Sequence, residues 1–131
     1  MYTGIIIGSQ SKSLSVFYSL FNRNENIKIT RTFHTIFDAL AFIRKQPPNL
    51  LIIDLATLEN ITHQHWQKIR DLKRKSNLFL TAYHIDTTLE GLNKEVTGYL
   101  LKPVCQEDID NAVQKVKIIR NNQTLSYKAI E

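Results

Sequence analysis

The sequence predicts an α/β fold: a doubly wound, five-stranded parallel sheet with helices on both faces. Two observations carry this prediction. Short apolar runs alternate along the chain with segments in which apolar residues recur at helical spacing, and this alternation is typical of parallel strands joined by right-handed crossovers. The run LLIID at residues 50–54 is also almost uninterruptedly apolar, as expected for a strand that is covered on both faces.

The first half of the chain predicts two strand–helix units. Residues 3–7 form a short apolar run before the turn-like segment GSQSKS, and residues 26–33 alternate apolar and polar side chains as a strand does. Thr35 is placed to cap the second helix, and Pro47-Pro48 ends it because proline lacks the N–H donor. The apolar faces consist of Leu14, Phe17, Tyr18 and Phe21 in the first helix and of Ile36, Leu40, Ala41 and Ile43 in the second.

The second half continues the alternation. Strands are expected at residues 50–54, 78–82 and 98–101, a helix at 63–75 and a weaker helix at 86–95. The final helix opens at Glu107 and Asp108, whose negative charges suit the first turn of a helix. Its inward face consists of Ile109, Ala112, Val113 and Val116, and no clear period follows from residue 121 to residue 131.

The composition indicates one domain in a reducing compartment. The 131 residues are 43% hydrophobic, enough for a sizeable core. The apolar runs are far shorter than the roughly 20 residues of a membrane span, and the N-terminus does not resemble a signal peptide. A lone cysteine, Cys105, cannot form an internal disulfide. We therefore expect a cytoplasmic domain over residues 1–120, with 121–131 as a tail or the start of a linker to an output domain.

The formal charge of +5 permits binding to an anionic partner, but the sequence offers little else toward nucleic acid. The basic residues of HWQKIRDLKRKS are interpreted as the solvated face of a helix. The histidines His63, His65 and His84 and the lone Cys105 lack the spacing of a closed metal site. No nucleophile motif and no glycine-rich phosphate loop is present, so we expect no catalytic residues and no metal ligands.

Polar side chains stand where three predicted strands end. Functional residues gather at the carboxyl ends of the strands in such sheets, which selects Asp54, Thr81 and Lys102. A carboxylate, a hydroxyl and an ammonium group can together hold a phosphoryl group, but Asp54 and Lys102 also suit a plain ion pair. We expect that ion pair in the resting domain. The residues that follow Asp54, LATL, do not favour a role for it as a helix cap.

These residues resemble a known family. The segments PPNLLIIDLATL, LFLTAY and GYLLKPVCQEDIDNAVQKV make residues 3–120 similar to the receiver domain of two-component response regulators, especially the LytTR (LytR/AlgR-type) regulators. The resemblance implies a flavodoxin-like (βα)5 fold in which Asp54 is the phosphoacceptor and Thr81 and Lys102 contact the phosphoryl group. It also implies that Tyr99, three residues before the lysine, occupies the switch position.

The chain departs from the family after the first strand. Receivers carry two acidic residues there that help to bind Mg²⁺, whereas this chain has Gly8, Ser9 and Gln10, and its first acidic residue is Glu25. The charges of Asp54 and Lys102 then cancel, so the attraction for a divalent cation is lost. Leu58 replaces a proline usual in the family, which we interpret as drift. Mg²⁺ binding is expected to be weak, and no other cofactor is expected.

The resulting hypothesis is a pseudo-receiver that acts mainly through protein–protein interaction. Its expected partners are a sensor histidine kinase or another signalling protein, with a possible homodimer through residues 86–120 and DNA reached only through an output domain. One alternative is a conventional receiver that is phosphorylated slowly and controls a DNA-binding output domain. A less favoured alternative is a small-ligand-binding flavodoxin-like domain. No enzymatic activity is expected.

Overall fold

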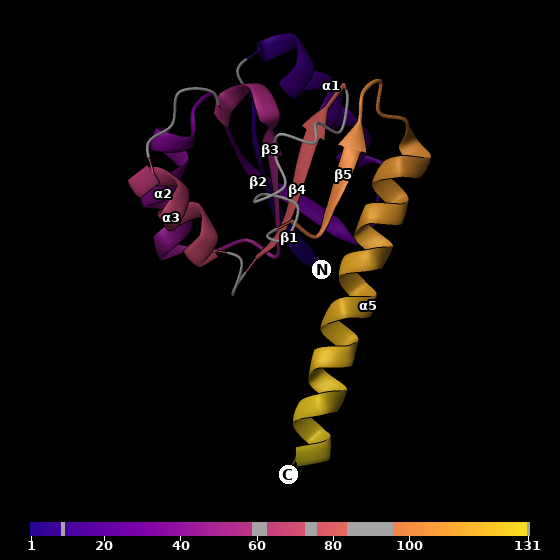
Figure 1. The fold of residues 1–131 in the computed structure, drawn as a ribbon. Coiled ribbons are helices and arrows are strands. Elements are labelled where there is room, and N and C mark those ends of the chain that lie inside the picture. Colours follow the sequence, from indigo (N-terminus) through magenta and orange to yellow (C-terminus); the bar gives the residue numbers. More distant parts are fainter. Residues whose placement is uncertain (9, 59–62, 73–75, 84–95, 131) are drawn as a thin grey trace.

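A computed structural model describes the chain except for residues 9, 59–62, 73–75, 84–95 and 131 (Figure 1). It contains a five-stranded parallel sheet in the order β2-β1-β3-β4-β5, which confirms the predicted fold class. This strand order is the one typical of flavodoxin-like folds. The strands are β1 (Tyr2–Ile7), β2 (Ile27–Phe33), β3 (Leu50–Asp54), β4 (Asn77–Ala82) and β5 (Gly98–Leu101).

Helices flank the sheet on both faces, as a doubly wound sheet requires. The hydrophobic cluster beneath α1 and α5 is separate from the cluster beneath α2 and α3. The predicted helix at 86–95 and the end of the predicted helix at 63–75 lie outside the described residues. The described helices are α1 (Ser11–Asn22), α2 (Ile36–Lys45), the short 3-10 helix η1 (Leu55–Leu58), α3 (His63–Leu72) and α5 (Gln106–Ile130).

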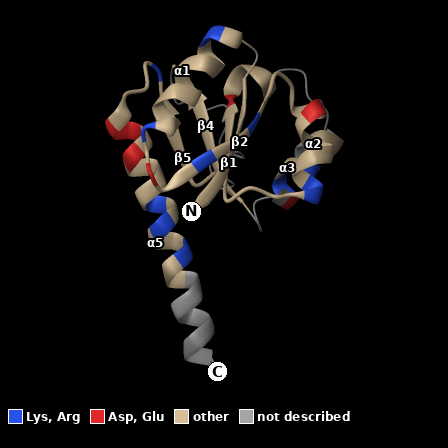
Figure 2. Cartoon of the chain, turned by 180° about the vertical axis from the view of Figure 1, so that it is seen from behind, with Lys and Arg blue, Asp and Glu red and all other residues tan. Residues whose placement is uncertain are grey.

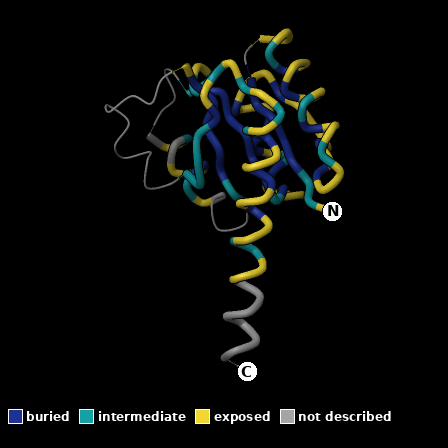
Figure 3. The backbone as a smooth tube through the Cα atoms, turned by 90° about the vertical axis from the view of Figure 1, so that its right-hand side faces the viewer, coloured by how far each residue is buried: buried dark blue, intermediate teal, exposed yellow. Residues whose placement is uncertain are grey.

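Neighbouring residues of each central strand contribute to opposite layers of the core. On β3, Ile52 packs toward α1 and α5, while Leu51 and Ile53 pack toward α2 and α3. All five residues of β3 are buried, as its continuous apolar run predicts, and the strands form the buried centre of the molecule in Figure 3. Burying each apolar side chain of β3 contributes about 1.5–3 kcal/mol, which stabilises the strand that carries Asp54.

Helix α5 extends well beyond the edge of the sheet (Figure 1). The sequence shows no clear period after residue 120, yet the helix runs to Ile130. No proline or glycine occurs between residues 106 and 130 that would end it. Among the described residues, no helix is both long and apolar enough to cross a membrane.

Candidate functional site

The predicted ion pair is present at the carboxyl edge of the sheet. Asp54 is the last residue of β3, and its Oδ2 accepts a hydrogen bond from Lys102 Nζ at 2.9 Å. The Asp54 and Lys102 side chains are only 9% and 14% exposed. The low exposure keeps the pair in an environment where a charge without its partner is costly.

Asp54 also caps the turn that follows it, contrary to the expectation from sequence. Its Oδ1 accepts from the backbone N–H of Ala56 at 3.3 Å, and its carbonyl accepts from Thr57 Oγ1 at 2.7 Å. The LATL segment forms η1 directly after the strand. A single 3-10 turn does not need the apolar period of a longer helix, which is why the sequence did not indicate this role.

Lys102 is held in place by β4 and by an aromatic ring. Its backbone N–H donates to the Ala82 carbonyl at 2.8 Å, just past the last residue of β5, and the Lys102-Pro103 peptide is cis. Its Nζ also lies 5.1 Å from the centre of the Tyr83 ring, within the range of a cation–π contact. Sequence reasoning missed Tyr83, although its place directly after the end of β4 was a signal for it.

Thr81 lies between the two charged residues in the sheet. It is paired with Asp54 on β3 and with Leu100 on β5. The residue is 1% exposed, and its Oγ1 has no hydrogen-bond partner among the described residues. A cavity of about 10 Å³ lies beside it, lined also by Asp54, Gly8 and Ser13. A buried hydroxyl without a partner is uncommon. The Thr81 hydroxyl can therefore donate a hydrogen bond to an oxygen atom of a group that binds beside Asp54.

The loop after β1 brings no carboxylate to the site. Gly8 is buried, and a Cβ atom added there would lie 2.9 Å from Leu14 Cδ2. Gln10 is exposed at the N-cap of α1 and makes no side-chain capping bond, and the first turn of α1 contains no acidic residue. Ser9 lies outside the described residues. The described loop residues therefore leave Asp54 as the carboxylate of this crevice.

Tyr99 is not part of this cluster. It lies in the middle of β5, opposite Leu80, and packs against the core layer beneath α2 and α3. Its neighbour Leu100 packs on the other face, toward α1 and α5. Burial raises the pKa of the Tyr99 hydroxyl above its ordinary value of 10.0. Tyr99 therefore packs into the core from within β5, whereas Lys102, directly after β5, pairs with Asp54 at the edge of the sheet.

The other chemically active residues have structural roles where they are described. The His65 ring stacks edge-on against Phe37 with centroids 4.5 Å apart. The Cys105 N–H and Sγ both lie near Asp108 Oδ2, at 3.1 and 3.2 Å, where α5 begins. No group of three metal-ligating side chains occurs in the described part of the chain, and His84 lies outside the described residues.

The basic cluster is described only in part. Lys68 is exposed and Arg70 is half-buried, whereas residues 73–75 lie outside the described residues.

Comparisons with known proteins agree with this architecture. No family model matches the chain. The chain is similar to the sensory transduction protein LytR of Staphylococcus epidermidis, with 22% identity over 126 residues. The match covers 96% of this chain and 50% of that protein, so the chain spans about half the length of its curated relative.

Solved structures of low sequence identity have a backbone fold similar to that of this chain. The receiver domain of the response regulator NarL from Mycobacterium tuberculosis superposes with a TM-score of 0.75 at 15% identity, covering 88% of this chain and 96% of that one. The response regulatory domain of protein mrkE from Klebsiella pneumoniae gives 0.75 at 19% identity, covering 92% and 98%. The chain therefore has the fold of response regulator receiver domains, which confirms the sequence resemblance at the level of the fold.

Proposed function

We propose that the chain is the receiver module of a two-component signalling protein and that it acts mainly through protein–protein interaction. The observation that carries this proposal is the ion pair of Asp54 with Lys102 at 2.9 Å, formed beside a loop that has glycine, serine and glutamine in place of acids. The pair supports the receiver assignment because the family resemblance places a phosphoacceptor and a phosphate-contacting lysine at these two positions.

The donors present do not fit a hard divalent cation. Mg²⁺ prefers octahedral coordination by oxygen atoms, with one or two carboxylates among them. Asp54 is the carboxylate available in the described crevice, and Lys102 already neutralises it. Phosphoryl transfer depends strongly on neutralising the oxygen atoms that are transferred. We therefore expect the metal-assisted phosphate switch of ordinary receivers to be weak here.

A conventional but slow receiver is the second candidate, and Thr81 favours it. In that function, an Asp54 oxygen attacks the phosphorus atom of a donor and the bond from phosphorus to the donor's leaving group breaks. The Thr81 hydroxyl, which has no described partner, and the Lys102 ammonium would then bind the phosphoryl oxygens. This candidate would control a DNA-binding output domain in a longer protein.

A small-ligand-binding function has less support. The cavity beside Asp54 and Thr81 is about 10 Å³, far below the roughly 300–1,000 Å³ of ligand pockets. The expected protein partners are instead a sensor histidine kinase or another cytoplasmic signalling protein. The region 86–120, which the structure describes from residue 96, remains our proposed homodimer face.

Phosphorylation by acetyl phosphate with Mg²⁺ separates the first two candidates. Intact-mass spectrometry of the chain should show little or no addition of a phosphoryl group over a period in which a conventional receiver is fully modified. The Asp54→Ala variant is the control for the modified position. Rapid addition to the parent that is absent from Asp54→Ala would establish the conventional receiver and overturn the pseudo-receiver.

A further inference from the structure

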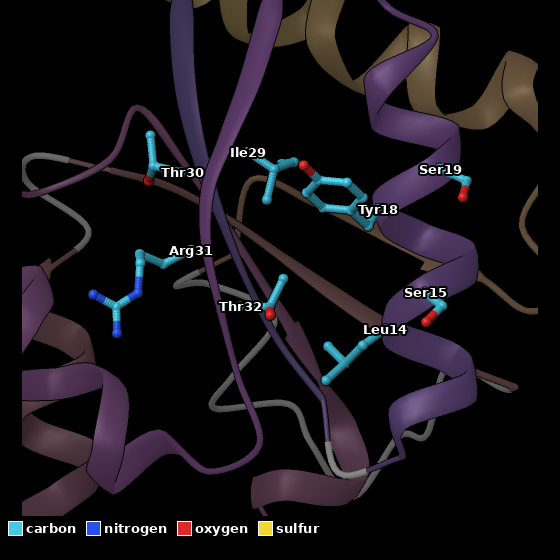
Figure 4. A pocket seen from close by; sticks show the side chains of 8 residues that line it. All are labelled: Leu14, Ser15, Tyr18, Ser19, Ile29, Thr30, Arg31 and Thr32. Carbon is cyan, nitrogen blue, oxygen red and sulfur yellow. The ribbon is translucent and has the colours of Figure 1, made fainter.

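A groove separates helix α1 from β2, the strand at one edge of the sheet (Figure 4). Its volume of about 560 Å³ lies within the roughly 300–1,000 Å³ of known binding pockets. Leu14 and Ile29 give it an apolar floor, and the Tyr18 ring points from α1 toward Ile29. Hydroxyl groups of Ser15 and Ser19 on α1 and of Thr32 on β2 line it as well, whereas the Thr30 side chain lies on the side of β2 away from α1.

The outer edge of β2 has no strand beside it in the described part of the chain. The sheet order places β2 first, with β1 as its neighbour. Alternate residues of a parallel strand direct their backbone N–H and C=O groups to opposite sides, so part of β2 presents these groups outward. An extended peptide can pair with such an edge and place alternate side chains toward a neighbouring pocket.

A β-bulge limits the length of such pairing. Ile29 pairs with Gly4 and Arg31 with Ile5, which leaves Thr30 as an extra residue in β2. The Thr30 hydroxyl donates to the Gly4 carbonyl at 3.4 Å. Because a bulge bends its strand, a partner strand can follow only a short run on either side of Thr30. The affinity of such a partner strand would therefore depend strongly on contacts in the groove and on electrostatic attraction.

The surroundings of the groove are basic. Arg23 and Lys28 are exposed near one end and Lys12 near the other. The exposed acids nearby are Glu25 and, at the start of α5, Asp110, which accepts a hydrogen bond from Asn24 (Figure 2). The exposed Arg31 points away from α1 (Figure 4). An acidic segment gains electrostatic attraction here. A second copy of this chain would place two identical basic edges against each other, which disfavours self-pairing.

We propose that the groove between α1 and β2 binds an extended, acidic peptide segment of a partner protein, which adds a short strand to the free edge of β2. One face of the segment places its side chains toward the apolar floor formed by Leu14 and Ile29. Its acidic residues lie near Lys28 and Lys12. The site is distinct from the strand ends that carry Asp54, so the proposal does not depend on phosphorylation there.

Fluorescence anisotropy with labelled peptides tests the proposal on the full chain. The probe is the alternating peptide EVEVEVE, and the matched control peptide is KVKVKVK. We expect saturable binding of the acidic peptide, at least about tenfold tighter than the basic one at low salt and weaker as salt is added. Absence of saturable binding, or equal affinity for both peptides, would overturn the proposal.

Three variants locate the binding. Ser15→Trp fills the groove, while Val16→Trp adds the same bulk at an exposed neighbour that does not line it. We expect Ser15→Trp and Lys28→Glu each to weaken binding by about tenfold and Val16→Trp to leave it unchanged, with melting curves showing that each variant is folded. If a folded Ser15→Trp variant binds as the parent does, the groove is not the site.

Backbone amides give an independent readout. Amides between residues 27 and 33 that face the outer edge of β2 should exchange more slowly when the acidic peptide is bound. Unchanged exchange along β2 would mean that no strand is added. Displacement of the peptide by single-stranded oligothymidylate of higher affinity would assign the groove to nucleic acid instead. A peptide-free dimer that Lys28→Glu dissociates would assign it to a second copy of the chain.

Discussion

Lys102 Nζ lies 2.9 Å from Asp54 Oδ2, although Asp54 ends β3 and Lys102 directly follows β5, and these two strands are not neighbours in the sheet. The strand between them is β4, whose Thr81 is in register with Asp54. The lysine therefore reaches across the end of β4 to the carboxylate that a metal ion would otherwise use. The site is neutral in formal charge without any cation from solution.

The first prediction concerns Mg²⁺. Low-millimolar Mg²⁺ should leave the melting temperature and the fluorescence of Trp66 unchanged, because Asp54 is already paired and the loop at residues 8–10 has no carboxylate. Ca²⁺ serves as a second test ion. Saturable Mg²⁺ binding that disappears in Asp54→Ala would show instead that neutral ligands suffice.

The second prediction concerns repair of the site. Ser9→Asp combined with Gln10→Asp should restore Mg²⁺ binding, seen as an increase in melting temperature with added metal, since it supplies the missing carboxylates. The isosteric pair Ser9→Asn with Gln10→Asn is the control and should not respond. Gly8 is left unchanged because a Cβ atom there would lie 2.9 Å from Leu14 Cδ2. Equal responses of the acidic and amide variants would mean that these positions do not face Asp54.

The third prediction uses the buried hydroxyl of Thr81. Thr81→Val should stabilise the domain or leave it unchanged, because it removes a buried hydroxyl with no described partner, whose burial costs about 1–3 kcal/mol. Thr57→Val is the matched control. It removes the hydrogen bond to the Asp54 carbonyl and should cost about 0.5–1.5 kcal/mol. Urea denaturation measures both, and a clear loss of stability in Thr81→Val would reveal a partner for its hydroxyl.

The sequence alone predicted the strands and the ion pair of Asp54 with Lys102. Apolar runs fix which residues become central strands, and parallel strands bring their carboxyl ends to one edge. It was not sufficient for the cap that Asp54 forms or for the Tyr83 ring over Lys102. Both contacts depend on side-chain directions in short turns, which leave no periodic signal in a sequence.

The β-bulge at Thr30 escaped prediction for a related reason. The segment NIKITRTF has apolar residues at Ile27, Ile29 and Phe33, which suits a regular strand. Only the pairing with β1 shows that an extra residue separates Ile29 from Arg31. Register is a property of two strands together, so one strand's pattern does not reveal it.

The fourth prediction concerns pH. Hydrogen bonds from Asn24, and then from Gln106, hold the pKa of Asp110 below its ordinary value of 3.8. A carboxyl whose pKa is lowered on folding stabilises the protein above its unfolded pKa and loses that contribution as pH falls through the folded pKa. When the pH is lowered from neutral to below 3.8, the melting temperature of Asp110→Asn should therefore fall less than that of the parent. Identical acid profiles would show that the hydrogen bonds from Asn24 and Gln106 do not favour the charged carboxyl.

The last prediction measures the coupling of Asp54 with Lys102 by a double-mutant cycle in urea. Lys102→Met leaves the Asp54 carboxylate without its counter-ion in a site where its side chain is 9% exposed. The loss should approach the roughly 3–5 kcal/mol found when one partner of a buried pair is removed. Adding Asp54→Asn should recover part of it, because the uncompensated charge is then gone. The control cycle combines Asp54→Asn with Lys115→Met, whose ammonium donates to the Thr97 carbonyl instead, and its effects should add. A coupling energy near zero in the first cycle would mean that the two charges do not interact in solution, and the proposed receiver site would lose its main support.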